Sequence, residues 1–162
     1  MSKFKDHSLA AYLKVLSQRT PVPGGGSASA LTAALGAALI SMVANYSLGK
    51  GVSPSVQTKI KGVLKQNEKI RLRLLQLVDL DAQAYLKVVQ TRKASSAKRK
   101  AALRGAQDVP REVGRLCYAA VGLTPVLVAQ GNKYLVSDVE VALELLWAGY
   151  RSAMINVKIN QG

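Results

Sequence analysis

The chain has 162 residues, 49% of them hydrophobic, so it is long enough to bury a core and is not intrinsically disordered. Its one cysteine, Cys117, excludes an internal disulfide, and its one histidine, His7, disfavours zinc sites and Ser–His or Cys–His catalytic pairs. The 23 Lys and Arg against 9 Asp and Glu give a net charge of +14, which indicates an anionic ligand or partner.

The first half of the chain predicts three helices. Ser8 can cap a short helix whose apolar face holds Leu9, Tyr12, Leu13 and Leu16. After a Pro–Gly loop, a second helix is expected over residues 27–48, with Gly49 as its stop. Pro54 is a good first-turn residue for a third helix, which is expected to continue to about residue 92.

The second half is also predicted to be helical, and no segment alternates as a strand does. A basic segment, RKASSAKRK, interrupts the apolar pattern at residues 92–100. A fourth helical region is expected over 97–130, which Pro110 and Pro125 should kink or divide. Ser137 and Glu140 have the spacing of a capping box for a last helix to about residue 160. We therefore expect one all-α domain, residues 1–162, folded as a bundle of about five long helices.

The stretch between Arg19 and Lys50 carries no charge and is long enough to span a bilayer. It is mostly Ala, Ser, Gly and Thr, so we expect a buried helix packed through small side chains rather than a membrane span. The chain begins with polar and charged residues, so no signal peptide is expected. Together with the lone cysteine, this predicts a cytoplasmic protein without a membrane partner.

The segment TPVPGGGSASA, residues 20–30, sets two prolines and three glycines directly before the second helix. A helix start presents unpaired N–H groups, and glycines there let a ligand approach the backbone and permit positive φ. The arrangement suits an anionic or carbonyl-bearing ligand at Gly24, Gly25, Gly26 and Ser27. A simple connector between helices would have the same composition.

The segment VDLDAQAY, residues 78–85, places a carboxylate on an apolar helix face. Asp79 points away from this face, whereas Asp81 lies near the centre of a stripe made by Ile70, Leu74, Leu77, Ala84 and Val88. A carboxylate there needs a partner, or its pKa rises through desolvation, which suits a general acid–base group. The alternative is a buried aspartate paired with a Lys or Arg.

Polar residues near the last helix form a third candidate group. In GNKYLVSDVE, residues 131–140, the capping box accounts for Ser137 and partly for Asp138, but not for Asn132. Asn156 and Asn160 are four residues apart and share a helix face. Their amides can bind a polar heterocycle or tie two helices together.

Six segments resemble, in order and approximate spacing, the cyclodeaminase/cyclohydrolase family: RTPVPGGGSASA, SLGK, DLDAQAY, DVPREVGRLC, GNKYLVSDV and NVKIN. That family contains methenyltetrahydrofolate cyclohydrolases and the cyclodeaminase domain of formiminotransferase-cyclodeaminase. The resemblance spans residues 8–160 and implies an all-helical homodimer with tetrahydrofolate chemistry and Asp81 as the acid–base residue. It makes pocket residues of Gly24, Gly25, Gly26, Ser27, Lys50, Asn132, Ser137, Asp138, Asn156 and Asn160.

The resemblance implies a cyclohydrolase, which converts methenyltetrahydrofolate to formyltetrahydrofolate with no metal or other cofactor. A formiminotetrahydrofolate cyclodeaminase, which releases ammonia, is the alternative, and the lack of a formiminotransferase segment favours the cyclohydrolase. The 13 Lys and Arg against three acids in residues 59–104 are expected to hold a folate's glutamate tail, with Lys50 as one contact. A non-enzymatic, nucleic-acid-binding helical protein is a further alternative, disfavoured by only 5% aromatic residues and no reading motif.

Overall fold

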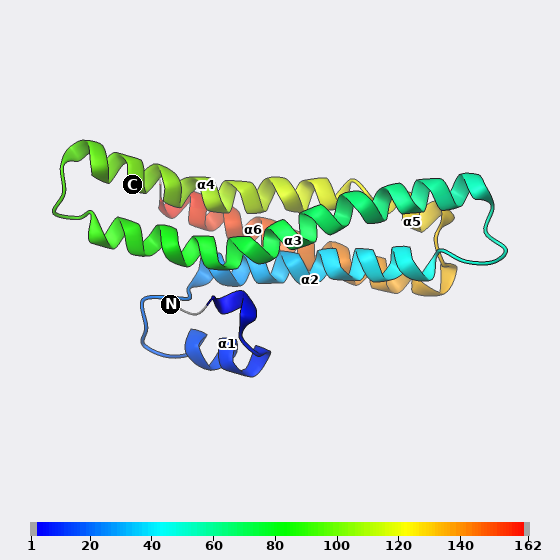
Figure 1. Cartoon of the computed structure of the whole chain (residues 1–162), viewed down its shortest axis with the longest axis horizontal. Coiled ribbons are helices and arrows are strands. Elements are labelled where there is room, and N and C mark those ends of the chain that lie inside the picture. The colour runs from blue at the N-terminus through cyan, green and yellow to red at the C-terminus, as the bar shows by residue number, and fades with distance from the viewer. Residues whose placement is uncertain (1–2, 161–162) are drawn as a thin grey trace.

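Four long helices run alternately up and down along one axis in the computed structural model, which describes residues 3–160 (Figure 1). They are α2 (Gly25–Tyr46), α3 (Pro54–Gln90), α4 (Ser96–Val121) and α6 (Val136–Ile159). The shorter elements are η1 (Phe4–Asp6), α1 (Leu9–Leu16), α5 (Thr124–Gln130) and η2 (Lys133–Leu135). Within residues 3–160 there is no strand, so the expected all-helical bundle is confirmed.

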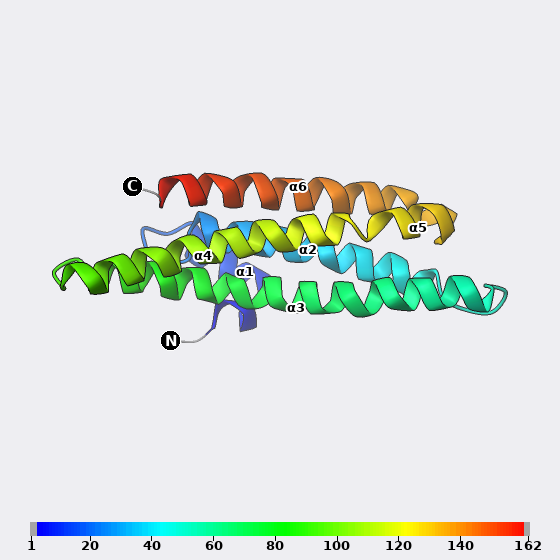
Figure 2. The same ribbon diagram turned by 90° about the horizontal axis from the view of Figure 1, so that it is seen from above.

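The arrangement of the long helices places α2 and α4 between α3 and α6. α2 and α4 each pack against both α3 and α6. Figure 2 shows α6 along one side of the bundle and α3 along the opposite side. The first turn of α2, the last turn of α6 and the hairpin between α3 and α4 consequently lie toward the same end (Figure 1).

Several helix starts follow the predicted capping chemistry. The Ser8 side chain accepts a hydrogen bond from the Ala11 N–H at 3.2 Å. The Ser53 side chain accepts one from the Val56 N–H, with Pro54 in the first turn of α3. α2 begins at Gly25, two residues earlier than predicted, after Gly24, which has no side chain with which to cap it.

Three expectations were wrong or incomplete. The capping box is wrong because η2 leads directly into α6, which starts at Val136, so Ser137 lies inside the first turn and makes no cap bond. The helix expected over 97–130 is divided at residues 122–123, with Pro125 opening α5, while α4 continues through Pro110. On α1, Leu9 and Leu13 are exposed, so the predicted apolar face is not buried as a whole.

Small side chains let α2 pack closely against its neighbours, as its composition predicts. A Cβ on Gly149 of α6 would come within 2.9 Å of the Ala33 Cβ, and one on Gly36 would come within 2.9 Å of the Ala142 oxygen.

Two stretches, Gly25–Tyr46 and Ser96–Gln130, are long and apolar enough to cross a membrane by length and composition alone. In the first, 61% of the most apolar window is buried inside the bundle, as in a core helix.

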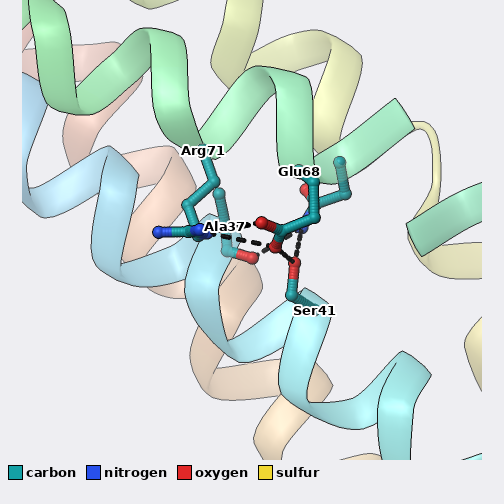
Figure 3. Close-up of polar contacts among 5 residues, drawn as sticks. Ala37, Ser41, Glu68 and Arg71 are labelled. Carbon is teal, nitrogen blue, oxygen red and sulfur yellow. Dashed lines mark hydrogen bonds and ion pairs between the residues drawn. The ribbon is translucent and has the colours of Figure 1, made fainter. Parts of the chain in front are cut away.

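A polar network fastens the middle of α2 to α3 (Figure 3). Asn67 is fully buried, and its Nδ2 donates to the Ala37 oxygen at 2.6 Å and to the Ser41 Oγ at 2.8 Å. The Ser41 hydroxyl donates to Glu68, which pairs with Arg71 at 2.7 Å. These bonds fix the axial position of α2 against α3, and with it the alignment of Gly26 and Asp81 farther along.

Candidate functional site

A cavity of about 320 Å³ lies where α2 begins, between the ends of α3, α4 and α6. Six of the residues predicted from sequence line it: Gly24, Gly25, Gly26, Asp81, Asn156 and Asn160. They come from three helices and from opposite ends of the sequence. The cavity is therefore the candidate functional site.

Asp81 lies in this cavity and replaces the cap that α2 lacks. The first N–H groups of a helix have no partner within it, and Gly24 offers no side chain. The Asp81 carboxylate, reaching over from α3, lies against Gly26, where it faces the backbone N–H of Ser27. Burial raises the pKa of Asp81, and the bond from Ser27 opposes this only in part. Across residues 3–160 Asp81 forms no ion pair, so the alternative of a buried Asp–Lys or Asp–Arg pair is wrong.

Of the three glycines, Gly26 allows the close approach of this carboxylate, and the loop does not need an unusual backbone conformation. A Cβ on Gly26 would overlap the Asp81 carboxylate, whereas one on Gly25 would be 3.8 Å from the Asn156 Oδ1 and one on Gly24 would meet open space. Gly24 has an extended φ of −130°, and within residues 3–160 the glycines with positive φ are Gly49 and Gly51. The expectation of positive φ in the loop was therefore wrong.

Ser27 contributes its backbone, not its hydroxyl, to the site. Its side chain is fully buried and lies 3.0 Å from the Tyr12 hydroxyl of α1, away from the cavity lining. Its N–H reaches Asp81. Sequence reasoning placed Ser27 in the pocket but did not distinguish these two parts of the residue.

Asp79 has a different environment from Asp81. Its side chain is buried, and its Oδ1 accepts the Phe4 N–H at 2.6 Å. It borders a separate hollow shared with Lys3 and Lys5, outside the cavity at α2. Asp79 thus fastens the N-terminal segment to α3, which agrees with its predicted orientation away from Asp81.

The two asparagines of α6 divide the roles that the sequence left open. Asn160 ties α6 to α4, because its Nδ2 donates to the Ala106 backbone oxygen at 2.9 Å and its backbone carbonyl oxygen accepts from Gln107 Nε2 at 2.6 Å. Asn156 donates to Ser152 on its own helix at 3.0 Å, which leaves its Oδ1 beside Gly25. Asn156 is therefore the better candidate for contacting a ligand.

The other four predicted pocket residues lie at the opposite end of the bundle. Lys50 follows the C-terminal end of α2, where Ser47 Oγ accepts the Asn132 N–H at 2.8 Å. The Asn132 side chain caps η2 by accepting the Tyr134 N–H. α2 is 22 residues long, so this end is about 33 Å from the Asp81 cavity. The residues separated from the cavity in this way are Lys50, Asn132, Ser137 and Asp138.

Sequence reasoning missed part of the cavity wall. Ala84 and Val88 were already on the predicted stripe around Asp81, and Tyr85 follows Asp81 by four residues, a helical spacing that could have identified it. The remaining lining residues, which no helical spacing connects to Asp81, are Pro21, Val22, Ala106 and Ile159. Among residues 3–160, no three His, Cys, Asp or Glu side chains gather as metal ligands would, and the expectation of no metal stays a prediction.

The hairpin of α3 and α4 projects toward one end of the bundle (Figure 1) and carries a dense group of positively charged side chains. We call residues 82–107 the basic arm. It contains no acidic residue, and within residues 3–160 none of its side chains forms an ion pair. Its seven Lys and Arg residues are all exposed: Lys87, Arg92, Lys93, Lys98, Arg99, Lys100 and Arg104. By contrast, Glu68 neutralises Arg71, and Glu112 pairs with Arg73 at 2.8 Å.

Comparisons with known proteins show which families the chain resembles. The chain is 34% identical to a methenyltetrahydrofolate cyclohydrolase of Methylorubrum extorquens, over 96% of this chain and 79% of that protein. It is 31% identical to the formimidoyltransferase-cyclodeaminase of Rattus norvegicus, but spans only 30% of its length. The crystal structure of a formiminotetrahydrofolate cyclodeaminase from Thermotoga maritima superposes with a TM-score of 0.93 at 31% identity, covering 98% of this chain and 80% of that one. Residues 8–162 match the formiminotransferase-cyclodeaminase family, and the chain belongs to that family.

Proposed function

We propose that this protein is a cytoplasmic methenyltetrahydrofolate cyclohydrolase, which converts methenyltetrahydrofolate and water reversibly to formyltetrahydrofolate. The observation that carries the proposal is the Asp81 carboxylate in the cavity at the start of α2. Its pKa is raised by burial, which brings it closer to the range in which one carboxyl both takes and gives a proton. The 34% identity to a cyclohydrolase supports this choice of reaction.

In the proposed reaction Asp81 acts first as a base and then as an acid. The ionised carboxylate stabilises the cationic methenyl group and takes a proton from water as the water oxygen bonds to the methenyl carbon. The same carboxyl then gives the proton to the nitrogen whose bond to that carbon breaks. One C–O bond forms and becomes the formyl C=O, and one C–N bond breaks. Of the two water protons, one passes through Asp81 to the nitrogen and the other is released to solvent, which balances the loss of the methenyl positive charge. The scheme requires no metal or redox cofactor.

Other cavity residues suit the positioning of a folate. The N–H groups in the first turn of α2, at Gly25 and Gly26, suit a carbonyl oxygen or a developing oxyanion. Tyr85, one turn from Asp81, offers an aromatic face to a flat ring. The Asn156 Oδ1 is placed to accept a hydrogen bond from a ring N–H or amino group.

A formiminotetrahydrofolate cyclodeaminase is the second candidate, favoured by the likeness to the Thermotoga maritima structure. It needs similar proton transfers, because a second nitrogen of the folate attacks the formimino carbon and the leaving nitrogen is protonated as it departs as ammonia. The two are distinguished by mixing purified protein with each substrate and following the methenyl absorbance. A cyclohydrolase removes the methenyl chromophore faster than buffer does. A cyclodeaminase leaves that rate unchanged and instead produces methenyl absorbance and ammonia from formiminotetrahydrofolate.

The basic arm is proposed to hold the glutamate tail of a folate, including polyglutamate forms. It joins the cavity directly, since Ala84, Tyr85, Val88 and Ala106 belong to both. Each added glutamate brings a carboxylate, and seven exposed cations without acids offer several contacts of about 0.2–1 kcal/mol each. A nucleic-acid partner is the rival for this charge, and it would compete with turnover at physiological salt.

A homodimer is proposed as the working form. α2 contains no charged residue, and exposed apolar side chains continue along it, including Leu35 and Tyr46. One chain cannot place Lys50 and Asp81 around one ligand about 33 Å apart, so Lys50 would join an Asp81 site only if a second copy brought it there. Sedimentation gives the oligomeric state. If Lys50→Ala leaves the KM for the folate substrate unchanged, Lys50 does not contribute to the Asp81 site.

A further inference from the structure

Tyr12 is the buried residue of α1, and its hydroxyl has a specific partner. The side chain is 4% exposed, and its ring meets Phe4 edge-to-face at 6.3 Å between centroids. Its hydroxyl lies 3.0 Å from the fully buried Ser27 Oγ. A tyrosine hydroxyl in such surroundings needs a hydrogen-bond partner, and Ser27 supplies it.

Ser27 connects Tyr12 to Asp81 through two different groups. It is the third residue of α2, so its N–H is one of those left unpaired at the helix start. That N–H faces the Asp81 carboxylate, which packs against the preceding Gly26, while the hydroxyl of the same residue meets Tyr12. A short series of polar contacts therefore leads from α1 through the first turn of α2 to α3.

We propose that Tyr12 is a positioning residue for Asp81, because its hydroxyl holds Ser27 and thereby holds the N–H that the Asp81 carboxylate accepts. The inference rests on the proposed catalytic role of Asp81. Tyr12 does not line the cavity and is not expected to touch the substrate. It would act through the first turn of α2, which it joins to the N-terminal segment.

The consequence of removing this hydroxyl has a definite sign. The Ser27 N–H stabilises ionised Asp81 and opposes burial, so a looser first turn raises the pKa of Asp81 further. Tyr85 is the other titratable group in the cavity, while α4 and α6 present neutral groups there. Lys5 and His7 border the hollow beside Tyr12. A Tyr12→Phe substitution leaves all of these in place.

The test follows the Asp81 carboxyl directly by NMR of carbon-13-labelled aspartate, with its signal identified by its loss in Asp81→Asn. Tyr12→Phe should raise the titration midpoint of Asp81 by about half a unit to one unit, the size expected from one ordinary hydrogen bond. The acid limb of the kcat profile for methenyltetrahydrofolate should move the same way, with KM nearly unchanged. Tyr118→Phe, which removes an exposed hydroxyl on α4, is the control and should shift neither.

A second variant, Ser27→Ala, tests the same interaction if Tyr12→Phe does not fold. Ser27→Ala removes the other hydroxyl of the pair and should raise the midpoint similarly, while the double variant should add little more. A folded Tyr12→Phe or Ser27→Ala protein with the wild-type Asp81 midpoint overturns the inference, whatever its activity. If the midpoint moves but the wild-type protein turns over neither folate, the positioning role stands and the proposed function fails.

Discussion

The Asp81 carboxylate of α3 lies directly against the α-carbon of Gly26 in α2, in the space that a side chain at residue 26 would occupy. This contact explains why residue 26, in the first turn of α2, is a glycine. A glycine there lets the carboxylate reach the N–H of the following residue, Ser27. The Asp81 position is thus fixed by backbone as well as by side chains.

Gly26→Ala is expected to displace Asp81 and lower kcat/KM by about a hundredfold, because misplacing a catalytic group by about 1 Å costs that much. Gly62→Ala, on α3 outside the cavity, is the control, since its Cβ would meet open space. Both variants should keep the helical circular dichroism of the wild type. Wild-type turnover by folded Gly26→Ala would show that the close contact is unimportant.

Asp81→Asn is expected to melt at a higher temperature than the wild type at pH 7. Burial raises the pKa of Asp81 above its ordinary 3.8, so between those two values the folded state binds more protons than the unfolded state. Stability is therefore lost as pH rises through that window, and an uncharged Asn, which can still cap α2, avoids the loss.

Calorimetry at several pH values checks this. Each kcal/mol corresponds to about 2–4 °C in a domain of this size. The gain of Asp81→Asn over the wild type should shrink as the pH approaches 3.8 and both side chains become neutral. A gain that stays constant with pH would mean that the charge of Asp81 is not the cause.

Asn67→Ala should lower the free energy of unfolding by about 1–3 kcal/mol, because it breaks the buried bonds to Ala37 and Ser41 and leaves polar groups unpaired (Figure 3). Chemical denaturation measures the change. Asn45→Ala, at an exposed position on the same helix pair, should change stability by less than about 0.5 kcal/mol. Equal changes in the free energy of unfolding for the two variants would show that the buried network does not hold α2 against α3.

Neutralising Lys98, Arg99 and Lys100 together should raise the KM for a pentaglutamate folate by about three- to tenfold and leave that for a monoglutamate almost unchanged. The difference should shrink at high salt, since exposed charges are screened over about 8 Å at physiological ionic strength. The control neutralises Lys59, Lys61 and Lys65, exposed on α3 outside the basic arm. Equal losses in both triple variants would point to general attraction, and a gel shift with DNA and RNA tests the rival partner.

Local patterns in the sequence predicted the elements and the centre of the site. The Ser53–Pro54 start of α3 and the Ser8 cap were predicted because they depend on neighbouring residues only. Asp81 was found because a single charged residue interrupts an apolar helix face. The predicted capping box at Ser137 was wrong, because the 3-10 turn η2 leads directly into α6 and Ser137 lies inside the helix instead of at its N-cap.

The parts that depend on packing were not predictable in the same way. The SLGK and GNKYLVSDV segments suggested one pocket with Asp81, but which end of a helix a segment occupies depends on the up-and-down path of the chain. Lys50 and Asn132 therefore lie about 33 Å away, across the length of α2. The partnership of Tyr12 with Ser27 depends on where α1 docks, which no spacing in the sequence encodes.

The central claim is that Asp81, and not Asp79, carries the proton in turnover. The most direct measurement compares Asp81→Asn and Asp79→Asn for kcat on methenyltetrahydrofolate, with substrate binding and helix content recorded for both. Asp81→Asn should lose about two to four orders of magnitude while still binding folate. Asp79→Asn, which changes only the bond to the Phe4 N–H, should stay within about threefold of the wild type. Small and equal losses in the two variants would contradict the account.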